Sequence, residues 1–245
     1  MNEAITHISS LANPRIKELG KLKPSPSSFL VEGFHLVEMA SEAGMLDKVY
    51  FVDRLPEGIA CNKAYSVTPE IIKKLSFSKS PEPILGLCHY QKPCKTSLNR
   101  SVVLDRVQDP GNVGAILRCC LAFGFKDVFL LPGTCSPFNE KAVAASQGAL
   151  FELNLHSITE EELLNLAQKE SISLYATALR DSVPFETYRF EKQEKLAFVF
   201  GNEGKGVSES LLSKAKARLR LAMEGIESLN VSVAAGILLY SIYVL

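Results

Sequence analysis

The chain of 245 residues is expected to fold as an α/β protein with a mainly parallel sheet and helices on both of its faces. Three observations predict this class. Apolar runs of strand length alternate with helix-like segments, and this alternation is typical of parallel sheets with helical crossovers. Glycine-rich turns follow two of these runs, at residues 109–114 and 201–206. The composition, 47% hydrophobic and 22% charged, is that of a globular protein with a sizeable core.

Residues 1–92 are expected to form a small α/β unit. Pro24 and Pro26 make residues 21–29 a loop. Thr68 is expected to cap a helix whose first position holds Pro69, where the missing N–H costs nothing. The expected elements after the loop are a strand and a helix within 29–44, a strand over 46–53, a helix over 68–76 and a strand over 83–90.

Residues 93–100 are expected to be a linker, because this stretch is polar and rich in turn formers, and a second unit, 101–245, follows it. The expected strands of this unit are 101–105, 127–131, 173–179, 195–201 and 220–223. Its expected helices are 110–124, 139–150, 159–171, 208–219 and the apolar C-terminal stretch. Ligands of parallel sheets bind beyond the carboxyl ends of the strands, where the glycine-rich turns fall.

The net charge, the cysteines and the N-terminal residues bear on the binding surface, on metal binding and on the location of the protein. The formal net charge is zero, which argues against a large basic surface but leaves room for a local patch. The six cysteines form no C-x-x-C pair and have no histidine pair at zinc-ligand spacing, so we interpret them as buried free thiols in a reducing compartment, with no metal. Residues 1–15 show no signal pattern, and the cytoplasm is the expected location.

The C-terminal stretch, residues 229–245, is almost uncharged and long enough to raise the question of a membrane span. It lacks a flanking basic cluster, and Asn230, Ser232 and Ser241 interrupt it. We therefore expect a helix that is buried in a core or in an interface, and no membrane contact.

Three loops carry candidate functional residues, and each is ambiguous alone. The first, LDRVQDPGNVGAILRCC, lacks the G-x-G-x-x-G dinucleotide pattern. In this loop, Asp105 and Asp109 are suited to cap a helix. Arg118, taken by itself, is typical of an arginine that lies on the surface or forms a salt bridge. In the third loop, RLAMEGIESLNVSVAAG, Ser228 and Asn230 suit the N-cap of an apolar helix.

The second loop, FVFGNEGKGVS, resembles a phosphate-binding loop only in part. Gly201 and Gly206 have the separation of the G-x-x-x-x-G-K-[ST] pattern, but Val207 stands at the lysine position and Lys205 precedes the second glycine. Glu203 would also repel a phosphate. The loop suits a ligand with amines, hydroxyls or positive charge better than a nucleoside triphosphate.

Together, the three loops resemble the SpoU (TrmH-type) branch of the SPOUT methyltransferases. The motifs LDRVQDPGNVGAILRCCLAFGF, FVFGNEGKGVS and LAMEGIESLNVSVAAGILLY match in order and spacing across 102–245. The stretches ISSLANPRIKEL and FLVEGFHLVEMA are similar to the small substrate-binding domain that often precedes this catalytic domain. The resemblance therefore covers most of the chain.

This resemblance implies an enzyme that transfers a methyl group from S-adenosylmethionine to a ribose 2′-hydroxyl of structured RNA. It also implies a deep trefoil knot near the C-terminus, a rare exception to unknotted topology, and a homodimer with active sites at the subunit interface. Residues 1–92 would be the RNA-binding domain and 101–245 the knotted methyltransferase domain. The expected substrate is 23S-type ribosomal RNA, with transfer RNA as the alternative.

The resemblance also assigns site residues. Those of the catalytic site would be Asn112, Arg118, Glu203, Ser228 and Asn230. Those of the cofactor site would be Thr177, Ala178, Gly201, Leu221, Met223, Ser228 and Leu229. Arg118 would act as a base or orient the hydroxyl, and we favour orientation because a guanidinium is almost never deprotonated in proteins. Ser228 and Asn230 would hold Arg118 and the substrate in place.

The chain departs from the family pattern at two places. Ala222 stands where a proline is usual, and residues 21–29 carry two lysines and two prolines where a basic run is usual. Two alternatives to a ribose methyltransferase remain at this stage. One is methylation of a base, against which the NVGAILR and ESLNVS motifs argue; the other is a non-catalytic RNA-binding or assembly protein, against which the presence of Arg118 and Asn230 argues.

Overall fold

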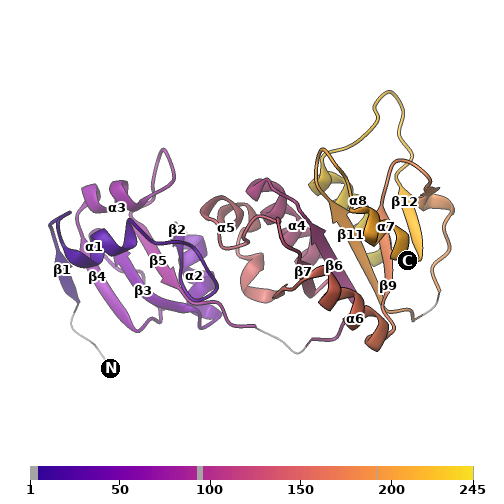
Figure 1. Cartoon of the computed structure of the whole chain (residues 1–245). Helices are drawn as coiled ribbons and strands as arrows, with labels where there is room; N and C mark the ends of the chain where they lie inside the picture. Colours follow the sequence, from indigo (N-terminus) through magenta and orange to yellow (C-terminus); the bar gives the residue numbers. More distant parts are fainter. Residues whose placement is uncertain (1–4, 93–95, 192, 245) are drawn as a thin grey trace.

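The computed structural model describes residues 5–92, 96–191 and 193–244 and contains two sheets that follow one another along the molecule (Figure 1). The smaller sheet has the order β1-β4-β3-β5-β2 and is mixed, because β5 runs antiparallel to both of its neighbours. Its unit comprises β1 Thr6–Ile8, α1 Pro14–Leu19, β2 Phe29–Glu32, α2 Phe34–Glu42, β3 Leu46–Phe51, β4 Lys63–Val67, α3 Pro69–Leu75 and β5 Ile84–Cys88.

The larger sheet has the order β10-β12-β9-β11-β6-β7-β8, and its recorded strand pairs are all parallel, as expected. Its elements up to β9 are β6 Arg100–Asp105, α4 Pro110–Ala122, β7 Asp127–Leu130, α5 Glu140–Ser146, the 3₁₀ turn η1 Ala149–Glu152, β8 Asn154–Ser157, α6 Glu160–Glu170 and β9 Ser173–Thr177. The remaining elements are β10 Val183–Pro184, the 3₁₀ turn η2 Phe185–Thr187, β11 Leu196–Gly201, α7 Glu209–Lys214, β12 Ala217–Arg220 and α8 Val231–Tyr243.

Helices cover both faces of the larger sheet. Alternate residues of a strand point to opposite faces, and the two apolar clusters follow this period. Val102 and Leu104 of β6 join a cluster with residues of α4, α5 and α8, whereas Val103 joins a cluster with residues of α6 and α7. The central strands are therefore buried on both sides, which explains why their sequences are continuously apolar. The α/β class is confirmed, and the trefoil knot stays a prediction.

The strand order places a topological switch point beside β6. After β6 the chain moves to β7 and β8 on one side, and β9, β11 and β12 then lie on the other side. The loops after β6 and β11 meet at this switch point, where open parallel sheets bind their ligands, and the helices that follow them, α4 and α7, lie on opposite faces of the sheet. Asp105 and Gly201, the last residues of these two strands, are register partners.

Some elements differ from the expectation. Helix α7 ends at Lys214 instead of continuing to 219, and β12 already begins at Ala217. Here Arg218 Nε donates to the carbonyl of Leu212, so a side chain satisfies the helix end and the chain becomes extended. Strands β1, β4, β8 and β10 and helix α1 were not expected. The expected linker at 93–100 includes residues 93–95, which lie outside the described residues, and its last residue already belongs to β6.

The smaller unit packs against α5 and η1 of the larger one. The ring of Phe29 in β2 lies 5.1 Å from that of Phe138 and 6.4 Å from that of Phe151. Tyr90 Oη donates to the carbonyl of Leu153 at 2.6 Å. Phe29 and these two aromatic partners belong to one apolar cluster that spans both units.

Helix α8 has a buried face and an exposed face. Ala235, Leu238, Leu239 and Ile242 are buried against the sheet and α4, so burial in the core is observed for half of this helix. The other half carries an exposed apolar stripe, which we define as Val233, Ile237, Tyr240, Tyr243 and Val244. No helix in the described part of the chain is long and apolar enough to cross a membrane.

Candidate active site

A chain of hydrogen-bonded side chains joins the three loops that the sequence singled out. Asn112 Nδ2 donates to Glu203 Oε1 at 3.0 Å, and Asn230 Nδ2 donates to Asn112 Oδ1 at 2.9 Å. We call Glu203, Asn112 and Asn230 the polar chain. Its members come from the loop after β11, the first turn of α4 and the start of α8. Both polar ends of the Asn112 amide are used, so its orientation is determined.

Helix capping explains why these residues stand where they do. Asp109 is the N-cap of α4, and its carboxylate accepts from the Asn112 N–H at 2.9 Å. Asn230 is the N-cap of α8, and its Oδ1 accepts from the Ser232 N–H at 2.9 Å. Capping, which alone would account for Asn230, leaves its Nδ2 group free to donate to Asn112. The same residue therefore starts a helix and joins the polar chain.

Glu203 is held as a charged group at the N-terminus of α4. Burial acts to raise its pKa, but hydrogen bonds from the Asn112 side chain and from the N–H groups of 203, 109 and 108 outweigh it and bring the pKa below the ordinary value of 4.5. The positive end of the α4 dipole also favours an anion here. Glu203 thus fastens its loop to α4 in the free protein.

The loop from Asn202 to Ser208 folds back tightly onto the end of β11. Asn202 and Gly206 exchange backbone hydrogen bonds of 3.1 and 2.8 Å, which close the loop. A Cβ added at Gly201 would lie 2.2 Å from Gly206 C and from Val207 N, so only glycine fits there. The N–H groups of Gly204 and Lys205 donate to Asn202 Oδ1, each at 3.0 Å. These amides are not available to a phosphate, in agreement with the departure from the phosphate-loop pattern.

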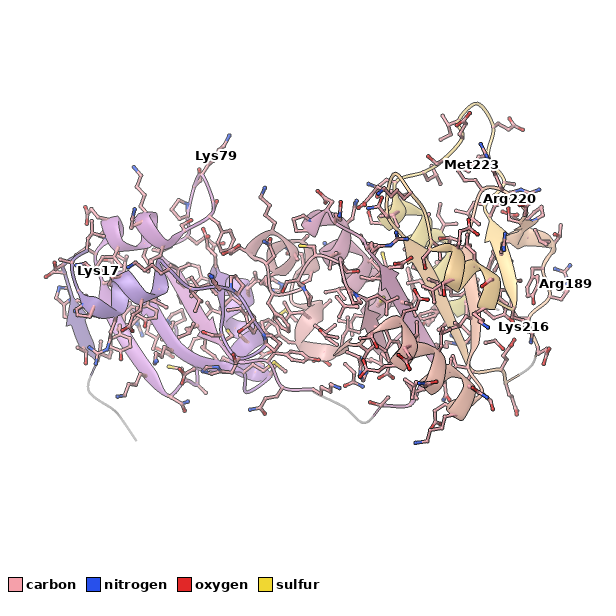
Figure 2. All side chains as sticks on the ribbon, in the orientation of Figure 1. Lys17, Lys79, Arg189, Lys216, Arg220 and Met223 are labelled. Atoms are coloured by element: carbon pink, nitrogen blue, oxygen red, sulfur yellow. The ribbon has the colours of Figure 1, made fainter. Side chains whose placement is uncertain are left out.

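The expected cofactor residues lie on neighbouring strand ends and on the loop after β12. Thr177 Oγ1 donates to the carbonyl of Val199 at 3.1 Å, and the Ala178 N–H donates to the carbonyl of Leu219 at 3.0 Å. These bonds tie the ends of β9, β11 and β12 together. Leu221, Met223 and Leu229 follow β12 and are half-buried. Met223 lies on the loop between β12 and α8, which extends away from the sheet (Figure 2).

These residues fit the adenosine and methionine parts of S-adenosylmethionine. Half-buried apolar side chains suit the flat base, and backbone groups at the strand ends suit its polar edge and the ribose hydroxyls. The glycine at 201 lets the main chain fold closely enough to form a wall. A carboxylate lies nearby and the amides of the loop are occupied, which suits a positively charged ligand better than a phosphate.

Arg118 and Ser228 lie outside the polar chain. Arg118 is exposed on α4, and Ser228 is exposed on the loop before α8. Within one copy of the chain, neither side chain has a hydrogen bond or ion pair to another described residue. Asn230 bonds Asn112 instead of Arg118, so the expectation that Ser228 and Asn230 hold Arg118 is not met by contacts inside one copy.

The first loop contains two residues whose roles the sequence did not indicate. Asp105 is not a helix cap: it is 3% exposed, ends β6, and accepts from the N–H of Ser208 at 2.7 Å. Arg106 pairs with it at 2.8 Å. The only sequence signal for Asp105 was its place at the end of a buried strand. An aspartate that caps a following helix would stand at the same place, so the sequence did not distinguish the two roles.

None of the described cysteines belongs to the polar chain. Cys61, Cys88, Cys119, Cys120 and Cys135 form no disulfide with one another. Cys88 and Cys120 are buried, and burial raises the pKa of both thiols. The other three are half-exposed, so the expectation of buried thiols was wrong for them, and Cys94 lies outside the described residues. Among the residues that the structure describes, no group of His, Cys, Asp and Glu side chains could hold a metal ion.

Comparison with known proteins identifies relatives over the whole chain. A family model described as the SpoU rRNA Methylase family matches residues 99–240. The 23S rRNA (guanosine(2553)-2′-O)-methyltransferase RlmP of Bacillus subtilis is 33% identical over 251 residues, which is 95% of this chain and 97% of that protein. The tRNA (guanosine(18)-2′-O)-methyltransferase of Thermus thermophilus is 34% identical, over 57% of this chain and 72% of its own.

A solved structure supports the same grouping. The AdoMet-bound rRNA methyltransferase from Sinorhizobium meliloti superposes with a TM-score of 0.83 at 25% identity, and the match covers 96% of each chain. Both sheets are therefore shared with that protein.

Proposed function

Because the chain belongs to the SpoU rRNA Methylase family, we propose that it methylates the 2′-hydroxyl of a guanosine ribose in 23S-type ribosomal RNA. It is an RNA 2′-O-methyltransferase that uses S-adenosylmethionine. The observation that carries the proposal is the polar chain, in which Glu203, Asn112 and Asn230 connect the three family motifs at the switch point of the sheet. A mere RNA-binding relative would not need these three loops in one fixed arrangement.

The cofactor would be held by the ends of β9 and β11 and by the loop after β12. The residues involved would be Thr177, Ala178, Gly201, Leu221, Met223, Ser228 and Leu229. S-adenosylmethionine, when bound, supplies a methyl group on a positively charged sulfur, a reactive carbon that no side chain offers. The carboxylate of Glu203 would add a favourable charge near this sulfur, in addition to holding its loop.

Arg118 would position the substrate. A 2′-hydroxyl is a weak nucleophile, so placing it correctly is a large part of the catalysis. Arg118 is exposed, and its side chain has no hydrogen-bond partner among the described residues. Its guanidinium is therefore available to bind an RNA phosphate and orient the neighbouring ribose. Ser228, also exposed, would contact the same nucleotide.

The assembly we propose is a homodimer in the cytoplasm, with the exposed stripe of α8 at the interface. The stripe is apolar over three turns of the helix, more than scattered surface residues explain. A partner copy would cover the stripe and bring its own residues near the end of α8. The C-terminal segment would be threaded as a trefoil knot.

Ribosomal RNA is favoured over transfer RNA because the rRNA relative matches both units, whereas the tRNA relative matches 57% of the chain. We assign RNA binding to residues 1–92, with 93–100 as a linker and 101–245 as the catalytic domain. Lys17 and Lys79 are exposed on the smaller unit and suit phosphate contacts (Figure 2).

The test is transfer of tritiated methyl from S-adenosylmethionine to RNA of a strain that lacks this gene. We expect the wild-type protein to label 23S RNA, at the guanosine that corresponds to the one in the Bacillus subtilis relative. Arg118→Ala should label it at least about 100-fold more slowly, because misplacement alone has such effects. Label in transfer RNA instead of 23S RNA would show that transfer RNA is the substrate. Cofactor binding without any label, on naked RNA and on assembling ribosomal particles alike, would make the protein a binding module.

A further inference from the structure

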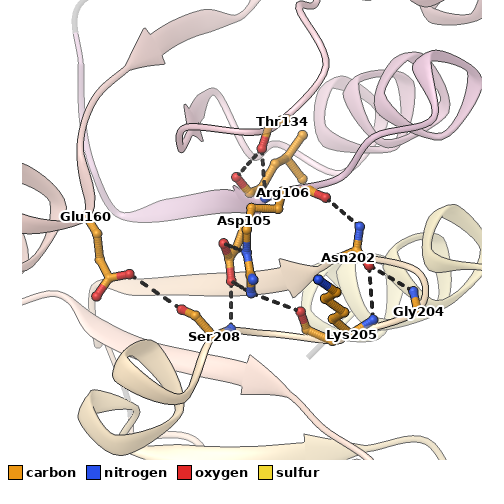
Figure 3. A network of polar contacts seen from close by, with 10 residues as sticks. Asp105, Arg106, Thr134, Glu160, Asn202, Gly204, Lys205 and Ser208 are labelled. Carbon is orange, nitrogen blue, oxygen red and sulfur yellow. Dashed lines mark hydrogen bonds and ion pairs between the residues drawn. The ribbon is translucent and has the colours of Figure 1, made fainter.

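A second polar cluster lies next to the polar chain, at the carboxyl end of β6 (Figure 3). Asp105 is buried, and Arg106 meets its carboxylate with two nitrogens: Nε lies 2.8 Å from Oδ1, and Nη2 lies 3.0 Å from Oδ2. This two-bond pairing fixes the plane of the guanidinium. The hydrogen bonds that Asp105 accepts from the guanidinium raise the pKa of Arg106.

The main chain of Arg106 is held as firmly as its side chain. Its φ is +59°, which is unusual for a residue other than glycine. Its N–H donates to Thr134 Oγ1 at 2.9 Å, and its carbonyl accepts from Asn202 Nδ2 at 3.0 Å. Such a conformation persists only when several contacts determine it together. Arg106 therefore joins the loops that follow β6, β7 and β11.

The loop from Asn202 to Ser208 is fastened at its start, middle and end by this pair. Asn202 is bound at the start through the carbonyl of Arg106. Arg106 Nη2 donates to the carbonyl of Gly206 at 3.4 Å, and the N–H of Ser208 donates to Asp105 Oδ2 at 2.7 Å. Glu203 follows Asn202 directly, so the same contacts determine where its carboxylate lies.

We infer that Asp105 and Arg106 are a positioning pair, which holds the loop from Asn202 to Ser208 in its cofactor-binding shape before the cofactor arrives. The inference rests on the proposed function, since that loop is taken to bind S-adenosylmethionine. Neither residue belongs to the polar chain, and Asp105 is too buried to meet a substrate. The pair acts through the loop.

The experiment compares the wild-type protein with Arg106→Gly and Arg106→Lys. Glycine removes the guanidinium but accepts the positive φ, so the variant isolates the side-chain contacts from backbone strain. Lysine keeps the charge but loses the planar fork. Arg54→Gly is the matched control, because Arg54 is an exposed arginine of the smaller unit whose side chain pairs, among the described residues, with Glu57 alone.

Hydrogen exchange without cofactor is measured first. In Arg106→Gly, the N–H groups of Gly204, Lys205 and Ser208 should exchange faster than in the wild-type protein, while the N–H groups of β11 keep their rates. By calorimetry, S-adenosylmethionine should bind about tenfold more weakly, with Arg106→Lys in between and Arg54→Gly unchanged. In the methyl-transfer assay, KM for the cofactor should rise by a similar factor, whereas kcat should change by less than about threefold.

Two results would overturn the inference in different ways. If the wild-type protein binds the cofactor and Arg106→Gly binds it equally well with unchanged exchange, the pair is only structural and the proposed function stands. If the wild-type protein binds no S-adenosylmethionine, the proposed function fails and the inference fails with it. Should Arg106→Gly not fold, Arg106→Lys decides by the same readouts.

Discussion

At the residue scale, the site depends on amide groups that serve two purposes. Asn112 accepts from Asn230 and donates to Glu203, and Asn230 also caps α8. The partners in these bonds are 91 and 118 residues apart in sequence. A replacement by aspartate at 112 would keep the cap of α4 but put two carboxylates side by side. Position 112 therefore requires a neutral amide, because the charged carboxylate of Glu203 needs a donor beside it.

The pKa of Glu203 predicts a pH dependence of stability. Burial acts against the charged form, but the hydrogen bonds from Asn112 and the backbone prevail, so the pKa in the folded protein lies below 4.5. A carboxylate whose pKa is lowered on folding stabilises the folded protein fully at a pH above its unfolded-state pKa. This stabilisation is lost as the pH falls through the pKa of the folded state. Wild-type protein should therefore unfold at a higher temperature than Glu203→Gln at pH 7, and the difference should shrink as the pH falls below 4.5.

Thermal unfolding of both proteins from pH 7 to pH 3 is the measurement. Glu57→Gln serves as a control, because the Arg54–Glu57 pair is exposed and should matter little at any pH. A difference between wild type and Glu203→Gln that stays constant over this range would contradict the role of the charge.

Sequence reasoning identified the residues of the polar chain but not their contacts. Asn112 and Asn230 stand at positions where helices begin, and Glu203 is the acidic residue of a glycine-rich turn. Which of them touch depends on how β11 returns beside β6, and no local pattern contains this information. Arg106 was missed for a related reason: its positive φ and its pairing with Asp105 arise only when three loops meet.

At the scale of elements, the helices that carry the site are packed closely. A Cβ added at Gly114 in α4 would lie 2.4 Å from the carbonyl oxygen of Ala142 in α5. This glycine lets the two helices approach, and the approach brings α5 and η1 within reach of the smaller unit. The motif glycine at 114 is thus explained by helix packing and not by a ligand.

The exposed stripe of α8 predicts the oligomeric state. Ile237 and Tyr240 are 42% and 53% exposed, and in the proposed dimer they lie in the interface. Ile237→Glu or Tyr240→Glu would bury a charge without a partner, at a cost of several kcal/mol, and should convert the dimer into a monomer. Analytical ultracentrifugation measures this directly. Ile5→Glu changes an equally exposed residue of the smaller unit and should leave the dimer intact.

A monomeric wild-type protein, or a dimer that both substitutions leave unchanged, would refute this interface. Loss of the dimer together with loss of methyl transfer would indicate that the site needs both copies.

Elements with a continuous apolar run or a clear helical period, such as the central strands and α4, α6 and α8, were predicted from sequence. The missed strands β1, β4, β8 and β10 contain no continuous apolar run. Strands β1 and β10 span 3 and 2 residues, too few for any alternation, and exist because a neighbouring strand offers hydrogen bonds. The boundary between α7 and β12 falls in a stretch of lysines, alanines and arginines that suits a helix as well as an edge strand.

At the scale of the whole molecule, the two units share one of the apolar clusters. Phe29 belongs to the sheet of the smaller unit, yet its ring packs against Phe138 and Phe151 of the larger one. The sequence of β2 indicated only a buried strand, because burial inside one unit and burial between two units both require the same apolar residues. The packing holds the proposed RNA-binding unit in a defined position relative to the polar chain, without reliance on the linker.

The central claim is that this molecule methylates a ribose and not a base. Mass spectrometry of 23S RNA, methylated with S-adenosylmethionine that carries a deuterated methyl group and then digested to nucleosides, tests it most directly. Fragmentation splits each nucleoside into base and sugar. We predict that the deuterated methyl group stays with the sugar of a guanosine and that Arg118→Ala leaves almost none. A label that stays with the base, or a wild-type reaction that labels no nucleoside, would contradict the account.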